Sequence, residues 1–188
     1  FAAEDIKAAD GVSEDYFKAD EKVGTITTDS NGIAQMEDLP AGKYYVKEVK
    51  TAHGYVLDGE PRYVNLSYRD QDTPVITYDE KWQNARQKVK VTVVKKEKDT
   101  DRVLAGGVFG LYTSEDIKNA KGEVLLEKDS LIEQRVTDEK GQITFTADLP
   151  VDGKYYVKEI FAPDGFVTTE EVQEFTFEYA GEDQAEVS

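Results

Sequence analysis

The sequence predicts an all-β protein built from two similar domains in tandem, and three observations carry this prediction. Short segments in which apolar and polar residues alternate recur along the chain, and many of the apolar residues are β-branched or aromatic. Turn signals, most of them residue pairs that end in glycine, separate these segments. The six residues KYYVKE occur twice, at 43–48 and at 154–159. Short alternating strands with turns between them favour an antiparallel sandwich or a small barrel.

The repeat extends over the length of a domain. Residues 4–7 (EDIK) return as residues 115–118, and their offset of 111 positions is also the offset between the two KYYVKE copies. A solenoid repeat spans only roughly 20 to 50 residues, so we expect two separate domains. The first is expected to cover residues 1–87 and the second residues 88–188, with the boundary near Gln87.

Individual elements follow from the period of two and from the turn signals. The clearest strands are expected at residues 43–48, 89–93, 142–146, 155–160 and 174–178. The clearest turns are expected at Asn31-Gly32, Lys140-Gly141, Asp152-Gly153 and Asp164-Gly165. Short helical turns are expected at residues 2–9 and 114–120, and nowhere else.

Composition argues against several classes of function. The formal net charge of −16 argues against binding to nucleic acid, whose phosphates require clustered Lys and Arg. The absence of cysteine excludes disulfides, thiolate nucleophiles and Cys-type zinc sites, and a single histidine, His53, excludes a His cluster or a catalytic triad. Since no apolar run approaches roughly 18 residues, we expect no insertion into a membrane. The chain opens at Phe1 without a methionine, and we expect it to be part of a longer protein.

In both copies of the repeated strand, a glutamate falls where an apolar residue is expected. Strand side chains alternate between two faces, so Tyr44, Val46 and Glu48 share one face while the lysines mark the solvated one. Glu48 and the equivalent Glu159 are therefore predicted to point inward. A buried carboxyl without a partner costs several kcal/mol, which indicates that the chain uses both groups.

Two further polar residues lie in phase with apolar ones. The strand at 89–93 directs its valines inward, and Lys95 is next in the same phase. Near the end of the first domain, Asn84 is in phase with Ile76, Tyr78 and Trp82, with Glu80 as the exception. Trp82 is expected in the core, in phase with Tyr78. Because bulges reverse the phase of a strand, an outward orientation remains the alternative for each residue taken alone.

Inward lysine, glutamate and asparagine side chains have complementary chemistry. Burial lowers the pKa of an amine and yields a nucleophile, and it raises the pKa of a carboxyl and yields a hydrogen-bond donor. Such an acid polarises a carboxamide carbonyl for attack by the amine and passes a proton to the departing ammonia. The product would be a Lys–Asn isopeptide bond, formed at the high effective molarity of groups that the fold holds in contact.

At these positions the sequence resembles the Cna B-type (collagen-adhesin B-type, SpaA-like) domains of Gram-positive surface adhesins and pilins. The resemblance covers nearly the whole chain and implies two tandem Ig-like or prealbumin-like antiparallel β-sandwich domains. In the first domain Ala52-His53 stands where the family has Ala-Pro. The motifs that carry the resemblance are residues 93–95 (VVK), 104–112 (LAGGVFGLY) and 156–166 (YVKEIFAPDGF), with 45–48 (YVKE) and 54–55 (GY) in the first domain.

The resemblance implies an autocatalytic intramolecular Lys–Asn isopeptide bond in each domain, formed once per molecule without enzymatic turnover and without cofactor or metal. Carried over by position, Lys95 is the nucleophile of the second domain and Glu159 its isopeptide-promoting acid. Glu48 is the acid of the first domain and Asn84 its carboxamide. The lysine of the first domain is expected upstream of the chain, and the asparagine of the second domain downstream.

We therefore expect a structural stalk or spacer module of a cell-wall-attached adhesin or pilin, on the outer surface of a Gram-positive bacterium. A bond between the first and last strands carries tension past the fold, and closing so long a loop adds about 4 to 5 kcal/mol on the disulfide scale. The expected partners are neighbouring repeats of the same polypeptide, a strand donor in trans, and a host surface or matrix protein held by another domain.

Three alternatives were weighed against the stalk. A ligand-binding adhesin module, recognising a host or extracellular-matrix partner through its loops, would need an exposed apolar patch or a groove. A hydrolase that pairs Glu48 with Glu159 is disfavoured, because equivalent positions in separate domains do not face one substrate. Calcium binding is also disfavoured, since the aspartate runs lack the Gly and terminal Glu of an EF-hand loop. Those runs are Asp70, Asp72 and Asp79, and Asp99 and Asp101, which we interpret as solvated turns.

Overall fold

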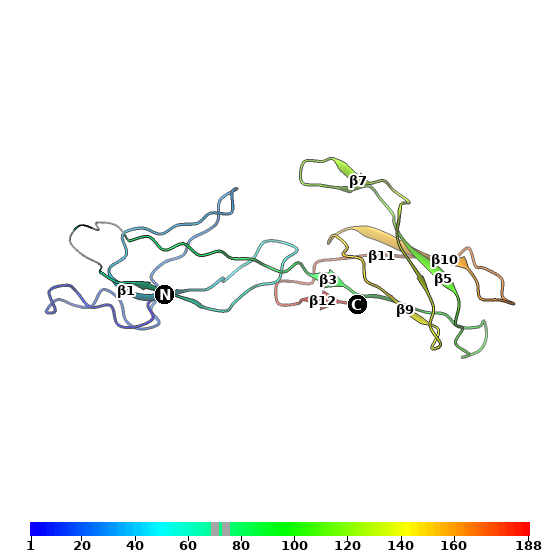
Figure 1. Cartoon of the computed structure of the whole chain (residues 1–188), viewed down its shortest axis with the longest axis horizontal. Helices are drawn as coiled ribbons and strands as arrows, with labels where there is room; N and C mark the ends of the chain where they lie inside the picture. The colour runs from blue at the N-terminus through cyan, green and yellow to red at the C-terminus, as the bar shows by residue number, and fades with distance from the viewer. Residues whose placement is uncertain (69–71, 73–75) are drawn as a thin grey trace. The chain divides into compact units, whose positions relative to one another are not determined.

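The computed structural model is all-β, as predicted, and describes residues 1–68, 72 and 76–188, a part of the chain that contains no helix. The chain divides into two compact units (Figure 1). The first unit comprises Phe1–Lys50 and Leu57–Asn84, and the second comprises Thr51–Val56 and Ala85–Ser188. The predicted domains, residues 1–87 and 88–188, are a different division of the chain, and their boundary near Gln87 remains a prediction.

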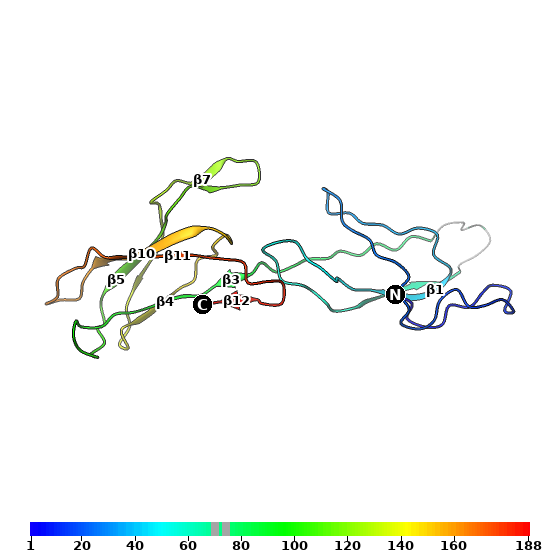
Figure 2. The same ribbon diagram turned by 180° about the vertical axis from the view of Figure 1, so that it is seen from behind.

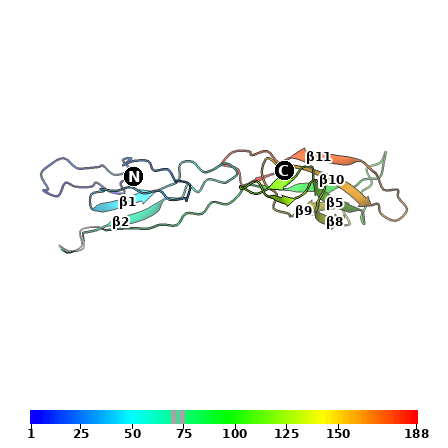
Figure 3. The same cartoon turned by 90° about the horizontal axis from the view of Figure 1, so that it is seen from above.

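The first unit is organised around one antiparallel pair of strands (Figure 3). Strand β1 (Gly42–Val46) pairs with β2 (Arg62–Leu66), and Tyr44 lies opposite Val64. Ala2 and Ile6 complete a small buried cluster with these two residues. Val46, expected to face inward with Tyr44, is instead 42% exposed. The reason is that the buried cluster ends at Tyr44 and does not extend along the strand.

The helical turns expected at residues 2–9 and 114–120 are wrong. In the first unit, Ala2 bridges Tyr44 and Ile6 bridges Phe17 in extended conformation. In the second unit, β6 (Ile117–Lys118) pairs with β7 (Val124–Leu126) and forms a hairpin (Figures 1 and 2). Extended pairing satisfies these backbone groups and still buries Ala2 and Ile6, so a helix gains nothing here.

One layer of the second unit is a four-stranded antiparallel sheet in the order β11, β10, β5, β8 (Figure 3). Burial alternates along β10, one of the two central strands, from Lys154 to Ile160, as the repeated KYYVKE pattern predicts. The register shifts by one residue between Glu159 and Phe161, where β10 pairs with β5. The bounds of the four strands are β5 (Val108–Thr113), β8 (Leu131–Val136), β10 (Lys154–Phe161) and β11 (Val172–Thr176).

The second layer is made of two shorter pairs (Figure 2). Strand β4 (Val91–Val94) runs antiparallel to β9 (Gln142–Phe145), and β3 (Lys88–Val89) runs parallel to β12 (Glu186–Val187). Val89, Val91 and Val93 pack onto a core of large buried side chains between the layers. That core contains Phe109, Leu111, Ile143, Phe145, Leu149, Tyr155, Val157 and Phe177. The second unit is thus a β-sandwich.

Candidate functional site

In the second unit, the sandwich brings Lys95 against Glu159. Lys95 directly follows β4, and its Nζ lies 2.9 Å from Oε1 of Glu159 on β10. The glutamate side chain is 0% exposed and that of the lysine 17%. The contact is an ion pair by distance, yet Oε1 accepts no hydrogen bond of regular geometry from the described residues. Both side chains take the inward orientation that the alternation predicts.

The second oxygen of Glu159 is held by the backbone. Its Oε2 accepts a hydrogen bond from the N–H of Thr169, at 3.0 Å. Thr169 lies in the connection between β10 and β11, ten positions after the glutamate. Because this donor is fixed in the backbone, it defines which oxygen of Glu159 faces Lys95. The carboxyl is therefore oriented from both ends.

The backbone of Lys95 is fixed on both sides. Its N–H donates to the carbonyl of Gly141 at 2.8 Å, and its own carbonyl accepts from the N–H of Leu104 at 3.0 Å. Gly141 has φ of 68°, and a Cβ there would lie 2.8 Å from the Lys95 carbonyl oxygen. Only glycine fits this approach without displacement. The Lys140-Gly141 turn thus positions the lysine as well as connecting two strands.

In the first unit, Glu48 contacts Asn84. Nδ2 of Asn84 donates to Oε2 of Glu48 at 2.6 Å, across a separation of 36 residues. The same oxygen accepts the backbone N–H of Asp58 at 2.9 Å. Glu48 is half-buried, less deeply placed than Glu159. The predicted acid and the predicted carboxamide of this unit are therefore in direct contact.

The two units share one arrangement around the glutamate. In each, the backbone N–H ten positions after the glutamate donates to its Oε2: Asp58 in the first unit and Thr169 in the second. In the first unit the carboxamide approaches this same oxygen, whereas in the second unit the lysine approaches the opposite one. The first unit thus brings together a glutamate and an asparagine, and the second unit a glutamate and a lysine.

Arg62 supports the contact between Glu48 and Asn84, and no pattern in the sequence marks it. Its guanidinium pairs with Asp58 at 3.1 Å and with Glu80 at 2.9 Å, and it lies 4.0 Å from the centre of the Trp82 ring. Trp82, expected in the core, is half-buried beneath this cation, and Tyr78 is exposed. The hydrogen bond from Tyr78, with that from Arg62, lowers the pKa of Glu80.

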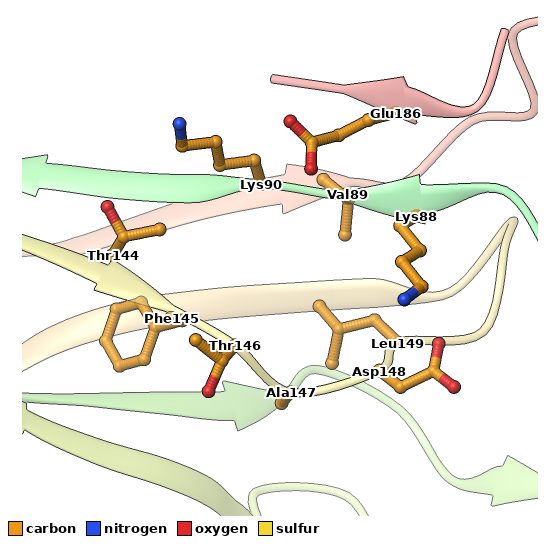
Figure 4. A pocket seen from close by; sticks show the side chains of 10 residues that line it. All are labelled: Lys88, Val89, Lys90, Thr144, Phe145, Thr146, Ala147, Asp148, Leu149 and Glu186. Carbon is orange, nitrogen blue, oxygen red and sulfur yellow. The ribbon is translucent and has the colours of Figure 1, made fainter.

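Neither the aspartates considered for calcium nor a surface depression in the second unit involves Lys95, Glu159, Glu48 or Asn84. The described residues contain no group of His, Cys, Asp or Glu that could hold a metal ion, and none of their segments is a helix able to cross a membrane. Asp70, one of the aspartates considered for calcium, lies outside the described residues, and Asp101 pairs with Lys96 at 3.1 Å. A depression beside β3 is lined by Lys88, Val89, Lys90, Thr144, Phe145, Thr146, Ala147, Asp148, Leu149 and Glu186 (Figure 4), so it is distinct from the Lys95 site.

Comparisons with known proteins agree with this architecture. The family model of the SpaA prealbumin-like fold domain matches residues 5–82 and again residues 89–188. A collagen adhesin of Staphylococcus aureus is 28% identical over 168 residues, which is 81% of this chain and 13% of the relative. The solved Bacillus anthracis TIE protein is 30% identical with a TM-score of 0.60, over 86% of this chain and 27% of that one.

The shaft pilin SpaA of Lactobacillus rhamnosus GG is 18% identical with a TM-score of 0.37, over 84% of this chain and 65% of that one. The chain thus spans only a small part of the collagen adhesin and of the TIE protein. The two matches to the family model together cover nearly all residues of this chain. The chain therefore belongs to the family of SpaA prealbumin-like fold domains, of which it carries two in tandem.

Proposed function

We propose that this chain is a load-bearing stalk segment of an extracellular surface protein, and that a Lys–Asn isopeptide bond closes each of its domains. The observation that carries the proposal is the pair of half-sites. A glutamate oriented by the same backbone donor meets an asparagine in one unit and a lysine in the other. Superimposed on one carboxyl, the two halves place the amine and the carboxamide at its two oxygens.

The proposed reaction uses each contact. The Lys95 amine attacks the side-chain carbonyl carbon of an asparagine, a C–N bond forms, and the bond from that carbon to Nδ2 breaks. The carboxyl of Glu159 accepts a proton from the amine and delivers one to the departing nitrogen, which leaves as ammonia. In the first unit Glu48 is 2.6 Å from the nitrogen that would leave, a distance suited to this proton transfer.

Two observations support a common position for the asparagine that would meet Lys95. Asn84 follows Glu48 by 36 positions, and the same step from Glu159 leads to position 195. Strand β12 runs parallel to β3 with an offset of 98 positions, from Lys88 to Glu186 and from Val89 to Val187. Continued along the strand, this register leads to about position 193 opposite Lys95. The two values differ by two residues, so we assign the carboxamide to this stretch of the polypeptide.

Such bonds would give the chain mechanical strength without cysteine. Force applied through the ends of a domain would pass through the isopeptide bond, and the strands between its two residues would carry none of it. The reaction occurs once per molecule, so the domain is a structural element and not an enzyme. We propose wall attachment to a Gram-positive cell and neighbouring repeats as the main partners, in keeping with the collagen-adhesin relative.

The proposal is tested by stretching single molecules of an extended chain. Appending the chain's own segment Tyr78–Asn84 after Ser188 places an asparagine at position 195. We expect the second domain to show no unfolding step, because Lys95 and the new asparagine are covalently joined. Glu159→Ala in the same chain should release about 100 residues, roughly 350 Å of contour length. Equal unfolding steps in both chains would refute the load-bearing role.

A further inference from the structure

Residues 51–56 pack as part of the second unit, although along the chain they interrupt the first. Val56 donates its N–H to the carbonyl of Ala85 at 2.8 Å, and Gln87 donates its N–H to the carbonyl of Gly54 at 2.9 Å. Tyr55 forms an antiparallel bridge with Arg86 between these two bonds. The segment is therefore paired along its backbone and is not a free loop.

The buried side chain of Gln87 builds the surface that receives this loop. Its Nε2 donates to the carbonyls of Gly181 and Gln184 at 3.0 and 2.6 Å, and its Oε1 accepts from the N–H of Ala180 at 2.8 Å. With these three bonds the amide is nearly saturated, and it fixes the loop at 180–184. Residues 85–87 and 179–184, together with Asp152, are called the receiving surface below.

Side chains complete the docking of residues 51–56. His53 Nε2 donates to Oδ2 of Asp152 at 2.6 Å. The ring of His53 packs edge-on against that of Tyr179, with 4.5 Å between the ring centroids. The hydroxyl of Tyr179 donates to the carbonyl of Tyr55 at 2.8 Å. Gly54 is buried, and a Cβ there would approach Val151 to 3.0 Å. The loop tip thus fits closely, and its recognition contains one hydrogen-bonded His–Asp pair.

The second domain has the same loop at residues 162–167, again 111 positions later. Gly165 has the φ of Gly54, 86° in both. Phe166 donates its N–H to the carbonyl of Pro163 at 3.0 Å, the same turn that Tyr55 makes with Ala52 at 3.2 Å. Here, however, Gly165 is exposed with open space around it, and Val167 is 91% exposed. The turn is formed, and Pro163 at its base is buried beside Gly106 and Gly107, but the tip at Gly165 has no neighbour among the described residues.

We propose that residues 162–167 are a docking loop for a following prealbumin-like repeat, which receives them as the second unit receives residues 51–56. By the offset of 111, Asp164 takes the place of His53, so Thr51-Ala52, and not the expected Ala52-His53, stands opposite Ala162-Pro163. Against a surface identical to that of the second unit, Asp164 would face Asp152 with the same charge. The partner repeat therefore has a basic or amide side chain at that place. This recognition is independent of the isopeptide bond.

The docking proposal is tested by grafting the sequence of residues 162–167 (APDGFV) in place of residues 51–56 in the full chain. Docking is read from hydrogen exchange of the Gln87 N–H, which donates to the carbonyl of residue 54. We expect exchange about fivefold faster than in the parent chain, because the hydrogen bond between His53 and Asp152 is replaced by a repulsion between two carboxylates. Asp152→Asn should restore the protection of the graft and weaken that of the parent. Asparagine suits this position because it tolerates the φ of 61°.

A control graft in which the glycine and phenylalanine are exchanged (APDFGV) should remain unprotected with either residue at position 152. The simpler pair His53→Asp and His53→Asp/Asp152→Asn should show the same loss and recovery as the graft. If Asp152→Asn gives the graft no more protection than the control, the docking loop is refuted. If the graft docks fully against Asp152, the proposed partner chemistry is refuted.

Discussion

Nζ of Lys95 lies 2.9 Å from Oε1 of Glu159. The other oxygen of this carboxyl, Oε2, accepts a hydrogen bond from the backbone N–H of Thr169. The first unit has the complementary arrangement, in which Asn84 contacts the oxygen that the N–H of Asp58 holds. The backbone donor therefore distinguishes the two oxygens in both units. One oxygen faces an amine in the second unit, and the other faces a carboxamide in the first, a division of roles that the proposed amide formation would use.

Removing the amine from the ion pair should destabilise the second unit. Lys95→Met leaves a fully buried carboxylate without its cation, and we expect a loss of about 3 to 5 kcal/mol in the free energy of unfolding. Glu159→Gln should cost less, because the partly exposed amine retains contact with water. Urea unfolding near neutral pH measures both values, and the double variant should recover part of the loss.

Lys96→Met is the matched control. Lys96 directly follows Lys95 in the chain and forms an exposed ion pair with Asp101. We expect a change below about 1 kcal/mol for this surface pair. Equal effects of Lys95→Met and Lys96→Met would show that the buried pair contributes no more than a surface pair.

Gly141→Ala should displace the backbone of Lys95. A side chain at φ of 68° costs roughly 1 to 2 kcal/mol by itself, and here its Cβ would also lie 2.8 Å from the Lys95 carbonyl oxygen. Gly122→Ala isolates the first effect, because φ there is 83° and nothing lies within 4 Å. The difference in unfolding free energy between the two variants measures the steric contribution. No difference would contradict the close approach.

Arg62 is expected to hold Asp58 in the position from which the Asp58 backbone N–H donates to Glu48. Arg62→Gln removes the ion pairs with Asp58 and Glu80 and the contact with the Trp82 ring. Exchange of the Asp58 N–H should become about tenfold faster, because the contacts that hold Asp58 in place are lost. Arg62→Lys should recover part of the protection, since it keeps the charge but not the planar fork. Unchanged exchange in both variants would limit Arg62 to surface charge.

Tyr155 should make the second unit sensitive to alkaline pH. Burial, with a smaller effect of the charge on Glu115, raises the pKa of Tyr155 to about 12. The phenol of the unfolded chain ionises near pH 10, so the unfolded state releases its proton first. The stabilisation is therefore complete below about pH 10 and is lost as the pH rises toward 12. Tm measured from pH 9 to 12 should fall steeply in the parent chain.

Tyr155→Phe should flatten this fall, whatever the loss of the hydrogen bond to Pro150 does to the Tm at neutral pH. Tyr63→Phe, at an exposed position, should leave the slope of the second unit unchanged. A parallel fall in the parent and in Tyr155→Phe would mean that other groups control the alkaline transition.

Alternation along strands was sufficient to place Lys95 and Glu159, because β4 and β10 are regular and each packs on the core with one face. The all-β class and the repeated domain followed from the same patterns and from the turn residues. Val46 fails the same rule, since the small core of the first unit ends before it and leaves one side of the strand open.

Features that depend on pairing between distant segments carried no local signal. The N–H groups of Asp58 and Thr169 belong to the backbone, so no residue type marks them. Arg62 contacts Asp58 four positions earlier, but its other partners, Glu80 and Trp82, lie about twenty positions later, and Gln87 acts through carbonyls almost a hundred residues away. The helical turn expected at residues 2–9 failed because Ala2 bridges Tyr44 of β1 and Ile6 bridges Phe17.

The most direct test of the central claim is the intact mass of the chain extended by its own segment Tyr78–Asn84 after Ser188. If Lys95, Glu159 and the appended asparagine form one reaction centre, the purified protein should lack the mass of one ammonia. Fragmentation should then join Lys95 to that asparagine, and Glu159→Ala should restore the full mass. A folded extended chain of full mass, with the parent Lys95 and Glu159 in place, would contradict the account.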